Sequence, residues 1–72
     1  MTALEQEDPG LTKRELEVVS MVSEGLSNPL IGARMNISIH TVKFHLHNAM
    51  EKLNAETRGH AVVLAMRLGL TA

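Results

Sequence analysis

The signals that start and stop helices constrain the fold of this chain more than any other feature. Ser and Thr side chains accept hydrogen bonds at helix N-termini, and Gly or Asn adopts the left-handed conformation in which many helices end. Such residues divide residues 11–70 into four segments with helical spacing of apolar residues, at about 12–24, 28–35, 38–53 and 57–68. No segment alternates apolar and polar residues as a strand does. The sequence therefore predicts an all-α domain of four helices.

The connections between the predicted helices are short. Thr12 and Glu15 have the spacing of a capping box, and Gly25 provides the first stop. Residues 35–38 (MNIS) predict a tight turn between the second and third helices.

Gly32 lies in the middle of the second helix, where Gly costs about 1 kcal/mol relative to Ala. Close packing of two helices would explain Gly32, and the alternative is that it simply weakens the helix.

Composition agrees with a small helical domain. The 72 residues are 44% apolar, with one Phe and no Trp or Tyr, so the core must consist of aliphatic residues and Met. The absence of Cys excludes disulfides and thiolate zinc sites. No apolar run approaches the ~18 residues of a membrane span, and the start of the chain lacks the pattern of a signal peptide. We therefore expect a cytoplasmic protein, with residues 1–10 as a flexible tail or the end of a linker.

Charge alone neither demands nor excludes a nucleic-acid partner. The formal net charge is −1, but three acidic residues and no Lys or Arg lie in residues 1–10. Residues 11–72 hold seven Lys and Arg against five Glu, an excess of two positive charges before four histidines are counted. The predicted domain is therefore mildly basic, and the position of its charges matters more than their sum.

The faces of the third predicted helix differ in character. At about 100° per residue, one face is apolar and is assigned to the core: Val42, Leu46, Ala49, Met50 and Leu53. A second face projects away from it: His40, Lys43, Phe44, His47 and Glu51. A third face is wholly polar: Thr41, His45, Asn48 and Lys52. A short helix and a tight turn precede this helix, as in a helix-turn-helix unit, whose second helix can enter the major groove of DNA.

Six sequence motifs in a fixed order carry a family resemblance: LTKRELEV (11–18), EGLSN (24–28), IS (37–38), TVKFH (41–45), KLNA (52–55) and HAVVLA (60–65). Over residues 11–70 the chain resembles the LuxR/GerE-type helix-turn-helix family of bacterial transcription regulators. The TVKFH and KLNAETR details look most like the quorum-sensing subgroup that responds to acyl-homoserine lactones. The resemblance implies a four-helix domain that binds double-stranded DNA, with the third helix reading bases.

The resemblance also assigns roles to individual residues. It implies base contacts by Lys43, Phe44 and His47. It implies DNA-backbone contacts by Ser27, Asn28, Thr41, His45 and Lys52. Lys suits guanine, Phe suits the thymine methyl group, and hydroxyl groups suit phosphate.

The fourth predicted helix carries more apolar residues than one small domain needs. Ala61, Val62, Ala65 and Met66 are assigned to the core, which leaves a second apolar set beside one Arg: Val63, Leu64, Arg67 and Leu68. The resemblance implies a homodimer through this set in helix 57–68, which would bind an inverted repeat. The alternatives are contact with an absent N-terminal domain or a surface that is merely apolar. On the dimer hypothesis, Leu64→Glu would weaken DNA binding without unfolding the monomer.

One other interpretation of the protein remains open. The family usually has a basic and then an acidic residue after LSN, where this chain has Pro29 and Leu30. The protein could therefore be an interaction module that pairs with a full-length regulator and inhibits it without reading DNA.

Arg34 and Arg58 are interpreted as solvated charges within reach of a phosphate. We expect no metal site, cofactor or catalytic activity, and RNA polymerase is a second partner that the resemblance allows.

Overall fold

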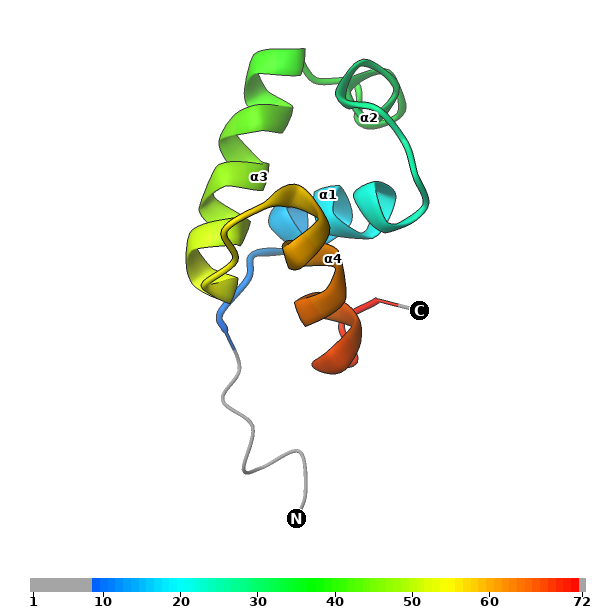
Figure 1. Ribbon diagram of the computed structural model, residues 1–72. Coiled ribbons are helices and arrows are strands. Elements are labelled where there is room, and N and C mark those ends of the chain that lie inside the picture. The colour runs from blue at the N-terminus through cyan, green and yellow to red at the C-terminus, as the bar shows by residue number, and fades with distance from the viewer. Residues whose placement is uncertain (1–8, 72) are drawn as a thin grey trace.

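A computed structural model describes residues 9–71 and contains four helices (Figure 1). They are α1 (Lys13–Ser23), α2 (Asn28–Met35), α3 (Ile39–Leu53) and α4 (Arg58–Arg67). No strand occurs within residues 9–71, so the all-α prediction is confirmed. The long α3 runs along one side of the domain, with α2 at one end and α1 and α4 crossing near its other end (Figure 1). The predicted tail falls mostly on residues 1–8, which lie outside the described residues.

The helix ends form as the sequence predicts. Thr12 and Glu15 make a reciprocal capping box at the start of α1. All four helices end with the same hydrogen bond, from an N–H just beyond the helix to a carbonyl five residues earlier: Leu26 to Met21, Ile37 to Gly32, Ala55 to Met50 and Leu70 to Ala65. This pairing satisfies carbonyl groups that a helix end would otherwise leave without a partner.

Two apolar clusters hold the helices together. The first joins α1, α2 and α3 and contains Val18, Val22, Ile31, Met35, Val42 and Leu46. The second joins α1, α3 and α4 and contains Val19, Ala49, Leu53, Ala61 and Ala65. The partly buried Met50 packs against both. The predicted core face of α3 is thus confirmed. Both clusters pack against this face, which leaves the opposite face of α3 exposed to solvent.

The turn between α2 and α3 is built around Gly32. Asn36 adopts the left-handed conformation, and the partly buried Ile37 packs against the first cluster. A Cβ atom on Gly32 would lie 2.8 Å from the backbone oxygen of Ile37 and 3.6 Å from Cγ2 of Val42. Close approach of α2 to the turn and to α3 therefore explains the Gly, and this resolves the two alternatives that the sequence left open.

We predict that Gly32→Ala lowers the free energy of unfolding by about 1–3 kcal/mol, the usual cost of overpacking. The methyl group would collide with a backbone oxygen, which moves only if the turn moves. This loss is expected to exceed the gain of about 1 kcal/mol in helix propensity. Urea denaturation measures the difference. Gly59→Ala in α4 is the matched control, because nothing lies within 4 Å of its added Cβ; a Gly32 variant as stable as this control would contradict the account.

The structure corrects the assignment of faces on α4. Ala61 and Ala65 are buried as predicted, but Met66 is 51% exposed and does not belong to the core. Leu64 and Leu68 instead pack, partly buried, against the second cluster. The sequence pattern was ambiguous because α4 is apolar nearly all round, so periodicity alone did not identify the inner side. No helix within residues 9–71 combines the length and apolar character needed to cross a bilayer.

Candidate nucleic-acid interface

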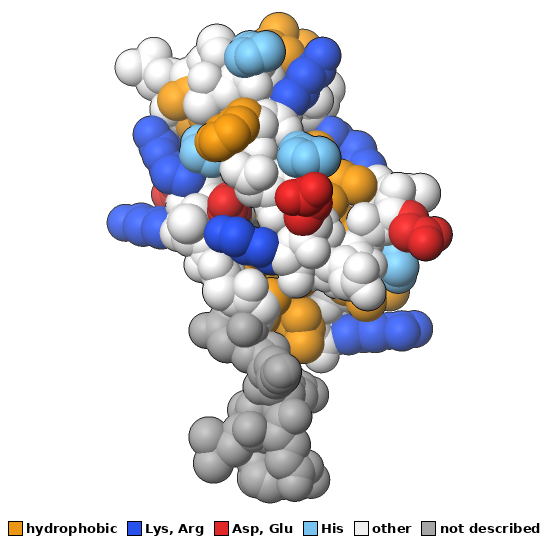
Figure 2. All heavy atoms as spheres, turned by 90° about the vertical axis from the view of Figure 1, so that its left-hand side faces the viewer, with side chains coloured by type: hydrophobic (Ala, Val, Ile, Leu, Met, Phe, Trp, Pro, Cys, Tyr) orange, Lys and Arg blue, Asp and Glu red, His pale blue; other side chains and the backbone are white. Residues whose placement is uncertain are grey.

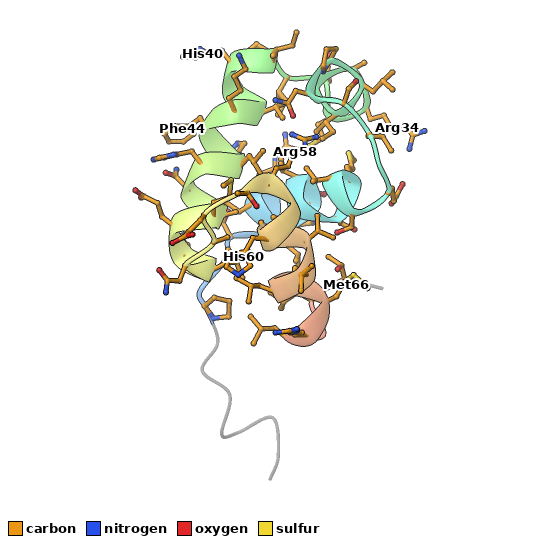
Figure 3. All side chains as sticks on the ribbon, viewed as in Figure 1. Arg34, His40, Phe44, Arg58, His60 and Met66 are labelled. Atoms are coloured by element: carbon orange, nitrogen blue, oxygen red, sulfur yellow. The ribbon has the colours of Figure 1, made fainter. Side chains whose placement is uncertain are left out.

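The outer face of α3 presents Phe44 to solvent. Its side chain is 60% exposed although it is the only aromatic residue in the chain. In Figure 3 it points away from the other helices. Figure 2 views this face and shows a hydrophobic side chain between histidines, with Lys, Arg and acidic groups around them. The prediction that Phe44 lies outside the core is therefore confirmed.

The predicted base-contacting residues share this face. Lys43 and His47 are exposed and lie one residue before and three residues after Phe44 on α3. The Nε2 atom of His47 lies 3.4 Å from Oε2 of Glu51, one turn further along. His45 is only partly exposed, and its ring meets the Phe44 ring edge-on with centroids 5.6 Å apart. Lys43, Phe44 and His47 thus project from adjacent turns of α3, with side chains that differ in polarity and shape. Such side chains can contact different base edges in a groove.

The N-terminus of α3 is held by its own cap. The Ser38 side chain accepts a hydrogen bond from the Thr41 N–H at 3.0 Å, and the two hydroxyl oxygens are 2.9 Å apart. Thr41, one of the predicted backbone-contacting residues, is therefore placed at the cap with its hydroxyl partly engaged. A hydroxyl both donates and accepts, so this contact leaves capacity for a further partner.

The N-terminus of α2 differs from the other three. Ser27 occupies the N-cap position, but its side chain makes no capping hydrogen bond, unlike Thr12, Ser38 and Thr57. Pro29 follows in the first turn and lacks an N–H. Ser27 is exposed and the neighbouring Asn28 is half-buried. Ser27 and Asn28, two of the five predicted backbone-contacting residues, thus lie at a helix start with polar groups available to a ligand.

An open cleft of about 610 Å³ lies beside the start of α2 and the first turns of α3. Its polar lining comes from Ser27, Asn28, Lys43 and Arg58, and its apolar lining includes Pro29 and Ile39.

The Arg58 guanidinium is bonded to the α2 start: Nη1 donates to Oδ1 of Asn28 at 2.6 Å, and Nη2 donates to the Leu26 carbonyl at 2.8 Å. The interpretation of Arg58 as a solvated charge was therefore wrong. Its spacing from Asn28, 30 residues along the chain, gave no local pattern to detect.

Lys52, predicted to contact the DNA backbone, already has partners within the domain. Its Nζ atom donates to Oε1 of Glu15 at 2.7 Å and to the carbonyl oxygen of Gly10 at 3.3 Å. The Glu15 side chain is only 5% exposed, against 35% for Lys52. Burial alone would raise the pKa of the Glu15 carboxyl, but hydrogen bonds and charge from Lys52 and hydrogen bonds from Thr12 outweigh it and lower the pKa below its usual value. Lys52 thus has a structural role that sequence spacing did not reveal.

Exposed apolar side chains near this face include Leu30, one of the two residues that depart from the family pattern. Leu30 is 57% exposed and Ile39 is 44% exposed. Within residues 9–71, no three His, Asp or Glu side chains come close enough to hold a metal ion. The face therefore offers positive charge, imidazole rings and apolar contacts.

Comparison with known proteins identifies the family. Residues 9–65 match the family model described as bacterial regulatory proteins, luxR family. The chain belongs to the LuxR family. The fold agrees with a solved structure of the transcription factor GerE, at a TM-score of 0.83 and 30% identity over 92% of this chain and 97% of that one. The LuxR family consists of transcription regulators with DNA-binding helix-turn-helix domains, and it is not a family of enzymes.

Curated relatives in the LuxR family are much longer than this chain. The uncharacterized transcriptional regulatory protein YxjL of Bacillus subtilis is 46% identical over 59 residues, which are 82% of this chain and 27% of that protein. The nitrate/nitrite response regulator protein NarP of Escherichia coli is 44% identical over 64 residues, or 86% of this chain and 30% of that protein. The chain thus spans less than a third of the length of these relatives. The quorum-sensing subgroup stays a prediction.

Proposed function

We propose that residues 11–70 form a unit that binds double-stranded DNA through α3 and so regulates transcription. The observation that supports this most is the outer face of α3, where Phe44 is exposed between Lys43 and His47 in a LuxR-family fold. Such a helix fits the major groove, where Lys can donate to guanine and an apolar ring can meet a thymine methyl group. Glu51 lies further along α3 and would be repelled by phosphate, so the first turns of α3 would enter the groove.

The start of α2 and the cleft beside it would hold the DNA backbone. Ser27, Asn28 and Thr41 offer uncharged hydrogen-bonding groups, and His45 lies on the same side of α3 as Thr41. Backbone contacts fix the register of a protein on DNA without reading its sequence. Lys52 is the weakest of the proposed backbone contacts because its ammonium group already pairs with Glu15. As a regulator of transcription the protein would act in the cytoplasm, with RNA polymerase as a further partner.

Salt dependence distinguishes this function from the rival interaction module. Affinity for any duplex should fall as salt rises, with a slope of about −0.9 in the log–log plot for each phosphate that a Lys or Arg side chain neutralises. Fluorescence anisotropy with a labelled duplex at several salt concentrations measures the slope. A folded domain with no measurable DNA affinity at low salt would favour the interaction module instead.

We further propose a homodimer through α4, with a revised contact surface. Val63 is 44% exposed and Met66 is 51% exposed, and the exposed Arg67 lies beside them. Their spacing of three and four residues places them on one stripe of the helix. Leu64 and Leu68, half-buried against the domain core, would contribute only their outer edges.

Met66→Glu is expected to disrupt the dimer while leaving the monomer folded, because half of the side chain is already in solvent. Sedimentation equilibrium should show a shift to monomer, and affinity for an inverted repeat should fall roughly tenfold or more, which is about 1.4 kcal/mol. Met66→Gln, of similar size and without charge, is the matched control. Leu64→Glu is a poorer test than the sequence suggested, since Leu64 also packs on the core. An unchanged dimer in the Met66→Glu variant would contradict this interface.

A further inference from the structure

Arg58 links the start of α4 to the start of α2, and both helices take part in the proposed function. It is the first residue of α4, yet its guanidinium reaches the start of α2 and bonds to Asn28 and to the carbonyl oxygen of Leu26. The two distances are 2.6 Å and 2.8 Å, and the second lies within the ordinary range for an N–H···O hydrogen bond. The residue is half-buried and in Figure 3 lies among the helices instead of pointing outward. Two hydrogen bonds from one planar group hold the α2 start in a single orientation.

The chemistry of Arg determines how the Asn28 amide is turned. A guanidinium has donors only, so the amide oxygen must face it and the amide nitrogen must face away. Within residues 9–71 the Asn28 oxygen is bonded to Arg58, and no acceptor is found for the amide nitrogen. Asn28 also lines the cleft that Lys43 and Ser27 share. Its two N–H donors are therefore left for an acceptor other than residues 9–71.

We propose that Arg58 is a positioning residue for DNA-backbone binding, which acts by holding Asn28 so that its amide N–H groups meet a phosphate. The proposal rests on the proposed function, because it needs DNA beside the cleft. Arg58 acts from α4, so the same helix that presents Met66 and Val63 to a partner also orients the backbone contact. The rival explanation is that Arg58 itself binds the phosphate as a cation.

Salt dependence separates the two explanations. Loss of an uncharged contact lowers affinity at every salt concentration and leaves the slope unchanged. Loss of a charged phosphate contact reduces the slope by about 0.9. Arg58→Lys keeps the charge but has no planar fork to bridge Asn28 and Leu26 at once. The Lys variant should therefore lose affinity if Arg58 positions Asn28, and should bind nearly normally if only its charge matters.

The test is a double-mutant cycle with Arg58→Lys, Asn28→Ala and the double variant, measured by anisotropy on one generic duplex over a range of salt. We expect each single variant to lose roughly fivefold in affinity, the double variant to lose no more than either, and all slopes to match the wild type. Additive losses, a normal Arg58→Lys variant, or a slope reduced by about 0.9 in the Arg58→Gln variant, which removes the charge, would overturn the proposal. A wild-type domain that does not bind DNA would instead overturn the proposed function.

Stability measurements guard against a merely structural explanation. Thermal unfolding of the same variants gives the folded fraction at the assay temperature, and affinities are compared only for folded protein. Asn28→Asp should raise the melting temperature, because a carboxylate accepts more strongly from Arg58 than an amide does. In an Arg58→Gln background the rise should be smaller, and an equal rise would show that the bond to Arg58 does not form.

Discussion

Replacing Glu15 by Ala is expected to lower the free energy of unfolding by about 2 kcal/mol, which is less than the roughly 3–5 kcal/mol for breaking a fully buried ion pair, because the Lys52 side chain that would lose its partner is 35% exposed. The Glu15 carboxylate accepts hydrogen bonds from the Thr12 N–H at 2.9 Å and from Lys52 at 2.7 Å. Its loss would remove half of the capping box of α1 and leave the Lys52 ammonium without its main partner. Urea denaturation at neutral pH measures the change.

Glu17→Ala is the matched control on the same helix. Glu17 pairs with Arg14 at 3.4 Å, but both side chains are well exposed. Exposed pairs of this kind contribute about 0.2–1 kcal/mol, so the same substitution should have a small effect there. Equal losses from the two variants would show that the Glu15 network does not stabilise the domain.

The Glu15 network also predicts how stability depends on pH. The folded-state pKa of Glu15 is lower than its usual value of 4.5. In acid the unfolded chain therefore takes up this proton before the folded domain does, so stability falls as pH drops below the usual value and through the folded-state value. The contribution is fully present at neutral pH. Glu15→Gln should lose stability at neutral pH and show a shallower decline in acid; an unchanged acid decline would contradict the assignment.

Lys43→Ala is expected to have the largest effect on sequence recognition. A good bidentate contact discriminates against the wrong base by about 1–3 kcal/mol, or roughly 5- to 150-fold. Lys43 is exposed on the outer face of α3 and also lines the cleft. We therefore expect the ratio of affinities for the preferred site and for unrelated DNA to fall at least tenfold. Competition binding with both duplexes at one salt concentration measures this ratio.

Lys13→Ala removes the same charge from an exposed residue of a different helix, the first residue of α1. It is expected to lower affinity slightly for every duplex, which leaves the ratio unchanged. If the Lys43 and Lys13 variants change the ratio equally, Lys43 contributes charge only and does not read a base.

Local sequence signals predicted the helices because each start and stop depends on neighbouring residues. The capping box at Thr12, the left-handed Asn36 and Asn54, and the core face of α3 all follow from spacing within one or two turns. The outward position of Phe44 followed for the same reason, since the opposite face of α3 was clearly apolar.

Contacts between distant residues were not predictable in this way. The partners of Lys52 and Arg58 lie 37 and 30 residues away, and neither pairing leaves a periodic signal. On α4 the small Ala61 and Ala65 face the core because close packing against α1 and α3 excludes larger side chains, so the longer Met66 faces solvent. Burial in a small domain depends on which surfaces meet, and that is a property of the assembled helices.

Selection from a random pool of duplex DNA tests the central claim most directly, with Lys43→Ala selected in parallel. The account predicts that the wild-type domain enriches an inverted repeat with half-sites about one helical turn apart, and that the variant loses preference at the base facing Lys43. A domain shown to be folded by its thermal transition that enriches no sequence would contradict base reading by α3. It would favour a module that pairs with another protein through α4.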